Sequence, residues 1–120
     1  MNRFRFNDTT EIAYETEGDG RPLLMLHGFG ASKSTWFDVR TQLSKTYRLI
    51  MPDLKGFGES SKPADDRYGI PDQASIICAL IRDLDLKDFT IMGHSYGGSV
   101  ALLTYLLLKD GGDHARAYLR

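Results

Sequence analysis

The chain has 120 residues, a length that fits one domain and is too short for two. Hydrophobic residues make up 42% of it and charged residues 26%, with a formal net charge of -1, so a disordered chain is not indicated. The 15 basic and 16 acidic residues are spread along the sequence, which excludes the concentrated positive charge typical of nucleic-acid binding.

Neither a membrane partner nor export is expected. The longest apolar run, around 106–108, is far too short to span a membrane, and the first six residues lack the apolar core of a signal peptide. The single cysteine, Cys78, cannot form a disulfide within the chain and is expected to be a small buried apolar residue. These features predict a cytoplasmic protein.

The N-terminal segment is predicted to form an antiparallel hairpin at a sheet edge. Phe4 and Phe6 alternate with arginines, as in a half-exposed strand, and Ile12 and Tyr14 alternate in the same way after a turn at 7–8. A glycine-containing loop follows, and the run at 23–26 is then apolar at every position. Such a run is typical of a strand that is buried in a parallel sheet.

The middle of the chain continues with a helix, a strand and a long loop. Ser34 is a plausible N-cap for a helix with four apolar positions on one face. A short buried strand is predicted at 49–51, and the segment 56–69 is rich in turn-forming residues and is predicted to be a loop. The apolar positions of the predicted helix are Trp36, Val39, Leu43 and Tyr47.

A second helix is predicted to begin near Pro71, because apolar residues then recur at helical spacing and proline suits the first helical turn. A further strand at 89–92 leads through a tight turn into a third helix that reaches about Lys109 and ends at 111–112. Alternation of apolar strands with helices predicts the α/β class, with a mostly parallel sheet flanked by helices and the N-terminal hairpin at one edge.

The chemistry is expected at the pentapeptide 93–97, Gly-His-Ser-Tyr-Gly. A serine hydroxyl is a weak nucleophile, and a sharp strand-to-helix turn can present it to a base. The residues two before and two after must then be small, and Gly93 and Gly97 meet that need. The turn also places Ser95 at a helix N-terminus, where free N–H groups favour a developing negative charge.

Three segments, in this order, resemble the α/β-hydrolase family: LHGFG at 26–30, DLKGFGES at 53–60 and GHSYG at 93–97, followed by Gly98. The resemblance covers nearly the whole chain. It implies that residues 1–120 are the N-terminal part of a single α/β-hydrolase domain, ending after the helix that follows the nucleophile turn. It also implies Ser95 as the nucleophile, with the backbone N–H groups of Phe29 and Tyr96 as the oxyanion hole.

The resemblance implies supporting roles for further residues around this turn. They are His27, Gly28, Gly93, His94, Gly97 and Asp53. For His27 and His94 the alternative is a role as general base, and for Asp53 it is a role in the active site rather than in its own loop. Glu59 is expected to be a solvated loop charge.

The base and the acid of the catalytic triad are expected to be missing. In the family both follow the serine on later strands. His114 comes after a helix of about 13 residues, roughly 20 Å long, so it cannot lie within hydrogen-bond reach of Ser95. Asp110 and Asp113 fail as triad acids for the same reason.

The chain is therefore expected to be a fragment. Segment 115–120 resembles the approach to a further strand, so the strand at 89–92 would be an exposed edge that invites self-association. The third helix, apolar on most of its surface, would need neighbours on several sides.

By resemblance the function is that of a serine hydrolase, carboxylesterase-like, acting on a small ester or similar carbonyl substrate. Lactone, carbon–carbon bond and cofactor-free haloperoxidase chemistry remain open. The alternative is a catalytically inactive product that oligomerises or binds a partner. An aspartate stands at the position of Ser95 in haloalkane dehalogenases and epoxide hydrolases, so those activities are disfavoured. No metal-ligand spacing or nucleotide-binding fingerprint is present, so no cofactor is expected.

Overall fold

The computed structural model describes residues 1–109 and 116–119. In chain order its elements are β1 (Asn2–Arg5), β2 (Glu11–Glu17), β3 (Arg21–Leu26), the 3₁₀ turn η1 (Lys33–Trp36), α1 (Phe37–Leu43), β4 (Tyr47–Pro52), α2 (Ile70–Asp83), β5 (Thr90–Gly93), α3 (Tyr96–Leu108) and β6 (Arg116–Leu119). This alternation of strands and helices confirms the predicted α/β class.

The strands form one sheet in the order β1-β2-β4-β3-β5-β6. β1 pairs antiparallel with β2, and β2 pairs antiparallel with β4, which confirms the predicted hairpin at the sheet edge. From β4 onward the neighbours run parallel, and Leu26 of β3 lies opposite Gly93 of β5. The two loops that follow these strands therefore leave the sheet side by side.

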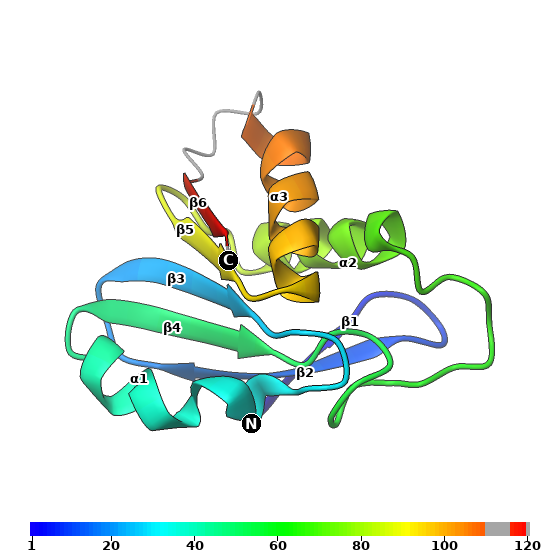
Figure 1. Cartoon of the computed structure of the whole chain (residues 1–120), viewed down its shortest axis with the longest axis horizontal. Helices are drawn as coiled ribbons and strands as arrows, with labels where there is room; N and C mark the ends of the chain where they lie inside the picture. Colours follow the sequence, from blue (N-terminus) through cyan, green and yellow to red (C-terminus); the bar gives the residue numbers. More distant parts are fainter. Residues whose placement is uncertain (110–115, 120) are drawn as a thin grey trace.

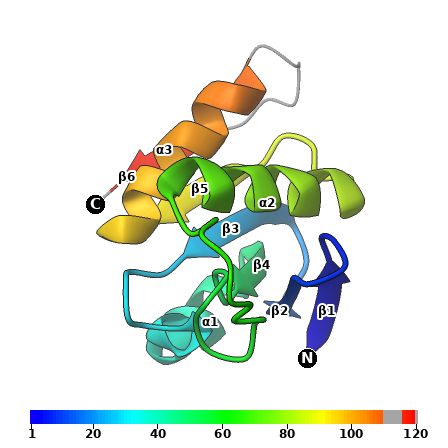
Figure 2. The same ribbon diagram turned by 90° about the vertical axis from the view of Figure 1, so that its right-hand side faces the viewer.

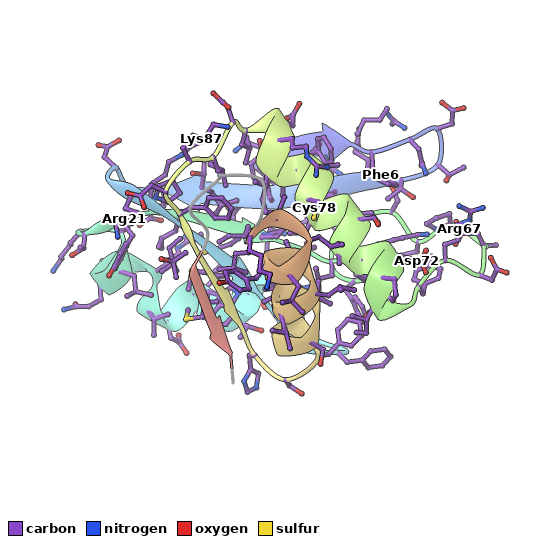
Figure 3. The ribbon with its side chains drawn as sticks, turned by 90° about the horizontal axis from the view of Figure 1, so that it is seen from above. Phe6, Arg21, Arg67, Asp72, Cys78 and Lys87 are labelled. Atoms are coloured by element: carbon purple, nitrogen blue, oxygen red, sulfur yellow. The ribbon has the colours of Figure 1, made fainter. Side chains whose placement is uncertain are left out.

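Helices cover both faces of the sheet. α2 and α3 lie over one face and α1 lies against the other, as Figure 1 shows from the side and Figure 2 shows end on. Leu24 of β3 packs in the core cluster beneath α2 and α3, whereas its neighbours Leu23 and Met25 pack with Trp36 on the opposite face. Cys78 of α2 is buried in the first cluster, as predicted, and Figure 3 shows it on α2 near α3.

The helix after β3 differs from the prediction. Its first turn is the 3₁₀ segment η1, and the N-cap is Ser32 rather than Ser34, since the Ser32 side chain accepts the Ser34 N–H. A 3₁₀ turn has about three residues per turn, so it shifts the apolar face that a continuous α-helix would present. Trp36 is buried as expected, but Val39 is exposed and Tyr47 already belongs to β4.

The prediction that the strand at 89–92 would form an exposed edge is wrong. Residues 116–119 form β6, which pairs parallel with β5, and Ile91 is fully buried. The predicted helix end at 111–112 lies outside the described residues. None of the helices in the described part of the chain is long and apolar enough to cross a membrane.

Candidate active site

Ser95 lies at the sharp turn that joins β5 to α3. Ser95 is the N-cap of α3. Its backbone dihedral angles are φ 56° and ψ -118°, a conformation that residues other than glycine rarely adopt. Its side chain is exposed to solvent. The turn therefore holds the serine hydroxyl clear of the strand, in a strained conformation of the kind that is found at functional sites.

Close backbone packing explains the two glycines of the turn. A Cβ atom on Gly93 would overlap the backbone of Gly97, and a Cβ atom on Gly97 would overlap the carbonyl oxygen of Leu26. In addition, the His94 N–H donates to the Leu26 carbonyl oxygen at 3.1 Å. The turn is thus docked on the end of β3, and only glycine fits at these two positions.

Two backbone N–H groups beside Ser95 are available to an anion. Within residues 1–109 and 116–119, the N–H groups of Phe29 and Tyr96 have no hydrogen-bond acceptor, whereas those of Gly97 and Gly98 donate to the preceding turn. The position of a Cβ atom on Gly28 would be 3.6 Å from the Ser95 Cβ, so the loop after β3 touches the serine. Free N–H groups at a helix N-terminus favour a nearby negative charge.

Aromatic rings surround this side of the turn. The Phe29 ring packs edge-on against Phe57 and Tyr96, with centroids 5.2 and 5.5 Å apart. Phe29 is nevertheless 75% exposed. The Tyr96 hydroxyl donates to the Tyr68 carbonyl oxygen at 3.3 Å, and burial raises the pKa of this hydroxyl. The surface beside Ser95 is therefore apolar and aromatic.

His27 is fully buried, and both of its ring nitrogens have backbone partners. Nδ1 lies 2.7 Å from the Gly28 carbonyl oxygen, and Nε2 accepts the N–H of Leu54 at 2.9 Å. The ring must then be neutral, with its proton on Nδ1. Burial lowers the pKa of His27 and outweighs the opposing effects of the Gly28 carbonyl and Asp53. This geometry leaves no nitrogen free to take a proton from Ser95.

Asp53 is fully buried and accepts three hydrogen bonds. Oδ1 accepts the Lys33 N–H at 2.7 Å, and Oδ2 accepts the Lys33 Nζ and the Glu59 N–H, each at 2.8 Å. Burial alone would raise the pKa of Asp53, but these donors, with Lys33 first, lower it below its usual value. The bond from Glu59 is of the kind expected for a role within the loop 53–60.

Sequence reasoning missed Lys33. Its side chain is only 7% exposed, and its Nζ contacts Asp53 and the Glu59 carboxylate, each at 2.8 Å. Burial would lower the pKa of Lys33, yet the hydrogen bonds to the two carboxylates raise it. Glu59, expected to be a solvated loop charge, is 57% exposed and is also an ion-pair partner of Lys33. A buried lysine carries no local sequence signal, because its partner Asp53 is 20 positions away.

The comparison with known proteins places the chain in a family. The family model described as the alpha/beta hydrolase fold matches residues 21–114. The chain belongs to this family. Strands β3, β4 and β5, the turn at Ser95 and the loop after β3 lie within the matched range, whereas β1, β2 and β6 lie outside it.

The similar proteins are named for different hydrolase activities. A 2-hydroxymuconate semialdehyde hydrolase of a Pseudomonas species is 35% identical over 71% of this chain and 31% of its own length. A soluble epoxide hydrolase of a Corynebacterium species is 36% identical over 73% of this chain and 30% of its own. An esterase from Exiguobacterium antarcticum has a TM-score of 0.80 and 34% identity over 88% of this chain and 39% of that one. The chain spans about a quarter to a third of the length of the curated relatives it matches.

In the described part of this α/β hydrolase, neither histidine is positioned as a general base for Ser95. His27 has both nitrogens occupied. His94 is exposed, its ring lies beside Gly28, and its side chain makes no hydrogen bond to any described residue. The supporting role expected for His94 stays a prediction. His114, Asp110 and Asp113 lie outside the described residues. Within those residues, no group of His, Cys, Asp and Glu side chains is arranged to hold a metal ion.

Proposed function

We propose that the chain supplies the nucleophile and the oxyanion hole of a serine hydrolase that acts on an ester or a similar carbonyl compound. The observation that carries the proposal is the strained, exposed Ser95 beside the N–H groups of Phe29 and Tyr96, which have no acceptor among the described residues. Membership of the α/β-hydrolase family and likeness to an esterase support it.

In the proposed reaction the Ser95 Oγ attacks the carbonyl carbon and gives its proton to a base. The carbonyl oxygen becomes negative and accepts hydrogen bonds from the Phe29 and Tyr96 N–H groups, a contribution of about 3 kcal/mol per donor. Collapse of this intermediate breaks the bond to the leaving group, which takes the proton, and leaves an acyl group on Ser95. Water, activated by the same base, then releases the acid and restores the serine.

The base and its carboxylate partner must come from residues that the structure does not describe, either in this polypeptide or in an associated one. A serine at position 95, where an alkyl-enzyme mechanism needs a carboxylate, disfavours dehalogenation and epoxide hydrolysis for this protein. Carboxylesterase activity in a reducing, cytoplasmic compartment is the reading we favour, with lactones, carbon–carbon bonds and haloperoxidase chemistry as variants of the same nucleophile. The proposal requires no cofactor.

A fluorophosphonate probe tests the proposal, because it reacts with activated serines. The gene product that carries this chain is incubated with the probe, beside its Ser95→Ala variant, and the labelled peptide is identified by mass spectrometry. We expect labelling at Ser95 in the wild type only, together with hydrolysis of p-nitrophenyl acetate that Ser95→Ala abolishes. Equal hydrolysis by Ser95→Ala would refute the proposal. For the isolated 120-residue chain we expect little or no labelling, because an oxyanion hole without a base activates serine weakly.

The second candidate is a catalytically inactive product that self-associates. Exposed leucines on α3 favour it. Leu102, Leu106 and Leu107 are 43%, 45% and 56% exposed, and α3 contacts the edge strand β6. An open edge and an apolar helix face both promote association. Sedimentation equilibrium of the 120-residue chain would then give an oligomer, and Leu107→Lys would shift it toward monomer while Val39→Lys, on α1, would not. A monomer at high concentration rules this candidate out.

A further inference from the structure

Two loops meet beside Ser95, and each follows a strand of the parallel part of the sheet. The first, residues 27–32 after β3, is called the oxyanion loop here because it contains Phe29; the second, residues 53–60 after β4, is called the Asp53 loop. His27, at the start of the oxyanion loop, joins the Asp53 loop through the N–H of Leu54. Lys33, directly after the oxyanion loop, joins it through Asp53. The oxyanion loop is thus tied to its neighbour at both ends.

The middle of the oxyanion loop has few anchors of its own. Phe29 is 75% exposed, and its ring touches Phe57 and Tyr96 only by edge-on contacts. Within the loop, the described backbone bond is from the Ala31 N–H to the Gly28 carbonyl oxygen, at 3.2 Å. The position of the Phe29 N–H relative to Ser95 therefore depends on the ties at the two ends.

The hydrogen bonds between Lys33 and Asp53 fix the position of the chain at the end of the oxyanion loop. Asp53 receives both the backbone N–H and the Nζ of Lys33, one on each carboxylate oxygen, so the start of η1 is held at two points. The second oxygen is also held by the Glu59 N–H. Gly58 has φ +54°, and a Cβ atom there would overlap the Asp53 carboxylate. The Asp53 loop is thus shaped around this carboxylate.

We infer that Lys33 and Asp53 form a positioning pair that sets the place of the Phe29 N–H for the reaction at Ser95. This inference rests on the proposed function. A buried ion pair is weak evidence for stability, because its attraction is largely offset by the loss of hydration. The role of the pair here is to fix the position of the oxyanion loop. Charge-assisted hydrogen bonds at 2.7 to 2.8 Å hold a loop that carries an oxyanion donor and has little packing of its own.

The test compares three variants of the gene product that carries this chain. Lys33→Met keeps the aliphatic stem and removes the charge, Lys33→Arg keeps the charge, and Lys45→Met removes an exposed lysine after α1 as a matched control. Two quantities are measured. The first is the order parameter of the Phe29 amide from ¹⁵N relaxation, which needs no catalysis. The second is the rate constant for labelling of Ser95 by a fluorophosphonate.

For wild type and Lys45→Met we expect a rigid Phe29 amide, with an order parameter of about 0.85, and equal labelling rates. For Lys33→Met we expect a mobile amide, below about 0.6, and labelling slower by at least about tenfold, because small displacements of a catalytic group have large kinetic effects. Lys33→Arg should recover most of the wild-type order parameter and most of the wild-type labelling rate. If Lys33→Met does not fold, the charge-neutral pair Lys33→Met with Asp53→Asn replaces it, with the same expectation.

A rigid Phe29 amide in Lys33→Met overturns the inference, whatever the labelling rate, and so does a mobile amide with an unchanged labelling rate. Failure of the proposed function looks different. If the wild type itself is not labelled, the serine hydrolase proposal falls, whereas the order parameter still decides whether Lys33 holds the oxyanion loop.

Discussion

The Nε2 of His27 accepts the backbone N–H of Leu54 at 2.9 Å, across 27 positions of sequence. The same ring holds the Gly28 carbonyl oxygen through Nδ1. One buried imidazole thereby bridges the loop after β3 and the loop after β4, and it does so only in its neutral form, since a protonated ring cannot accept a hydrogen bond.

His27 should make stability depend on pH. Burial lowers its pKa in the folded state below the value of about 6.5 in the unfolded chain, so the unfolded chain binds more protons in that range. The free energy of unfolding should therefore fall as pH drops below about 6.5. His27→Gln, which can still accept the Leu54 N–H but does not titrate, should remove this loss between pH 5 and 7 in urea titrations. His94→Gln is the control and should retain it; an unchanged profile in His27→Gln would contradict the assignment.

Gly97→Ala should be strongly destabilising. The added Cβ would overlap the carbonyl oxygens of Leu26 and His27, which belong to the backbone and can move only by shifting the turn. Overpacking of this kind costs about 1–3 kcal/mol, so the midpoint of urea unfolding should fall clearly. Ser99→Ala, at an exposed position of α3, should change the midpoint little. A Gly97→Ala midpoint equal to that of the control would show that the turn is looser than described.

Ser95→Gly should be more stable than Ser95→Ala, by about 1 kcal/mol. With φ at 56°, an alanine at this position keeps the backbone strain of the serine, whereas glycine adopts the conformation freely. Both variants lack the hydroxyl, so both should lose labelling by the fluorophosphonate. Chemical denaturation of the two variants measures the difference directly. Equal stability would mean that the strain at position 95 is absent in solution.

Lys33→Met should be destabilising by about 3–5 kcal/mol at neutral pH, because it leaves the buried Asp53 carboxylate without its cation. In the wild type the pKa of Asp53 is lowered and that of Lys33 is raised, so the pair stays ionised between about pH 5 and 9. Without Lys33, burial raises the pKa of Asp53. Protonation of Asp53 at low pH should then remove the buried, unpaired charge and reduce the loss of stability in Lys33→Met. The stability gap to wild type should narrow from pH 7 to pH 4.

The control for this pH dependence is Lys45→Met. Its free energy of unfolding should stay close to that of wild type at every pH. His27 also acts on the Lys33 and Asp53 pair, so the same series in the His27→Gln background separates the titration of His27 from that of Asp53. A gap for Lys33→Met that does not change with pH would mean that Asp53 keeps its low pKa without the lysine.

Much of the fold could be predicted from local pattern. The pentapeptide 93–97 predicted the turn at Ser95, because the need for small residues two positions away on either side is a property of a few consecutive residues. The helix near Pro71 and the buried strands followed from spacing that repeats within one element. The N-cap at Ser32 was missed, since two serines flank Lys33 and local preference does not distinguish them.

By itself, then, the sequence determined where the chain turns, which segments are apolar on both faces, and that a serine stands between a strand and a helix. Tertiary structure alone decided the rest of the site. It brought Lys33 to Asp53 and His27 to Leu54, and it placed β6 beside β5. The physical reason is that backbone preferences act over a few residues. The burial of a charge, by contrast, is tolerable only where a distant partner arrives to pair with it.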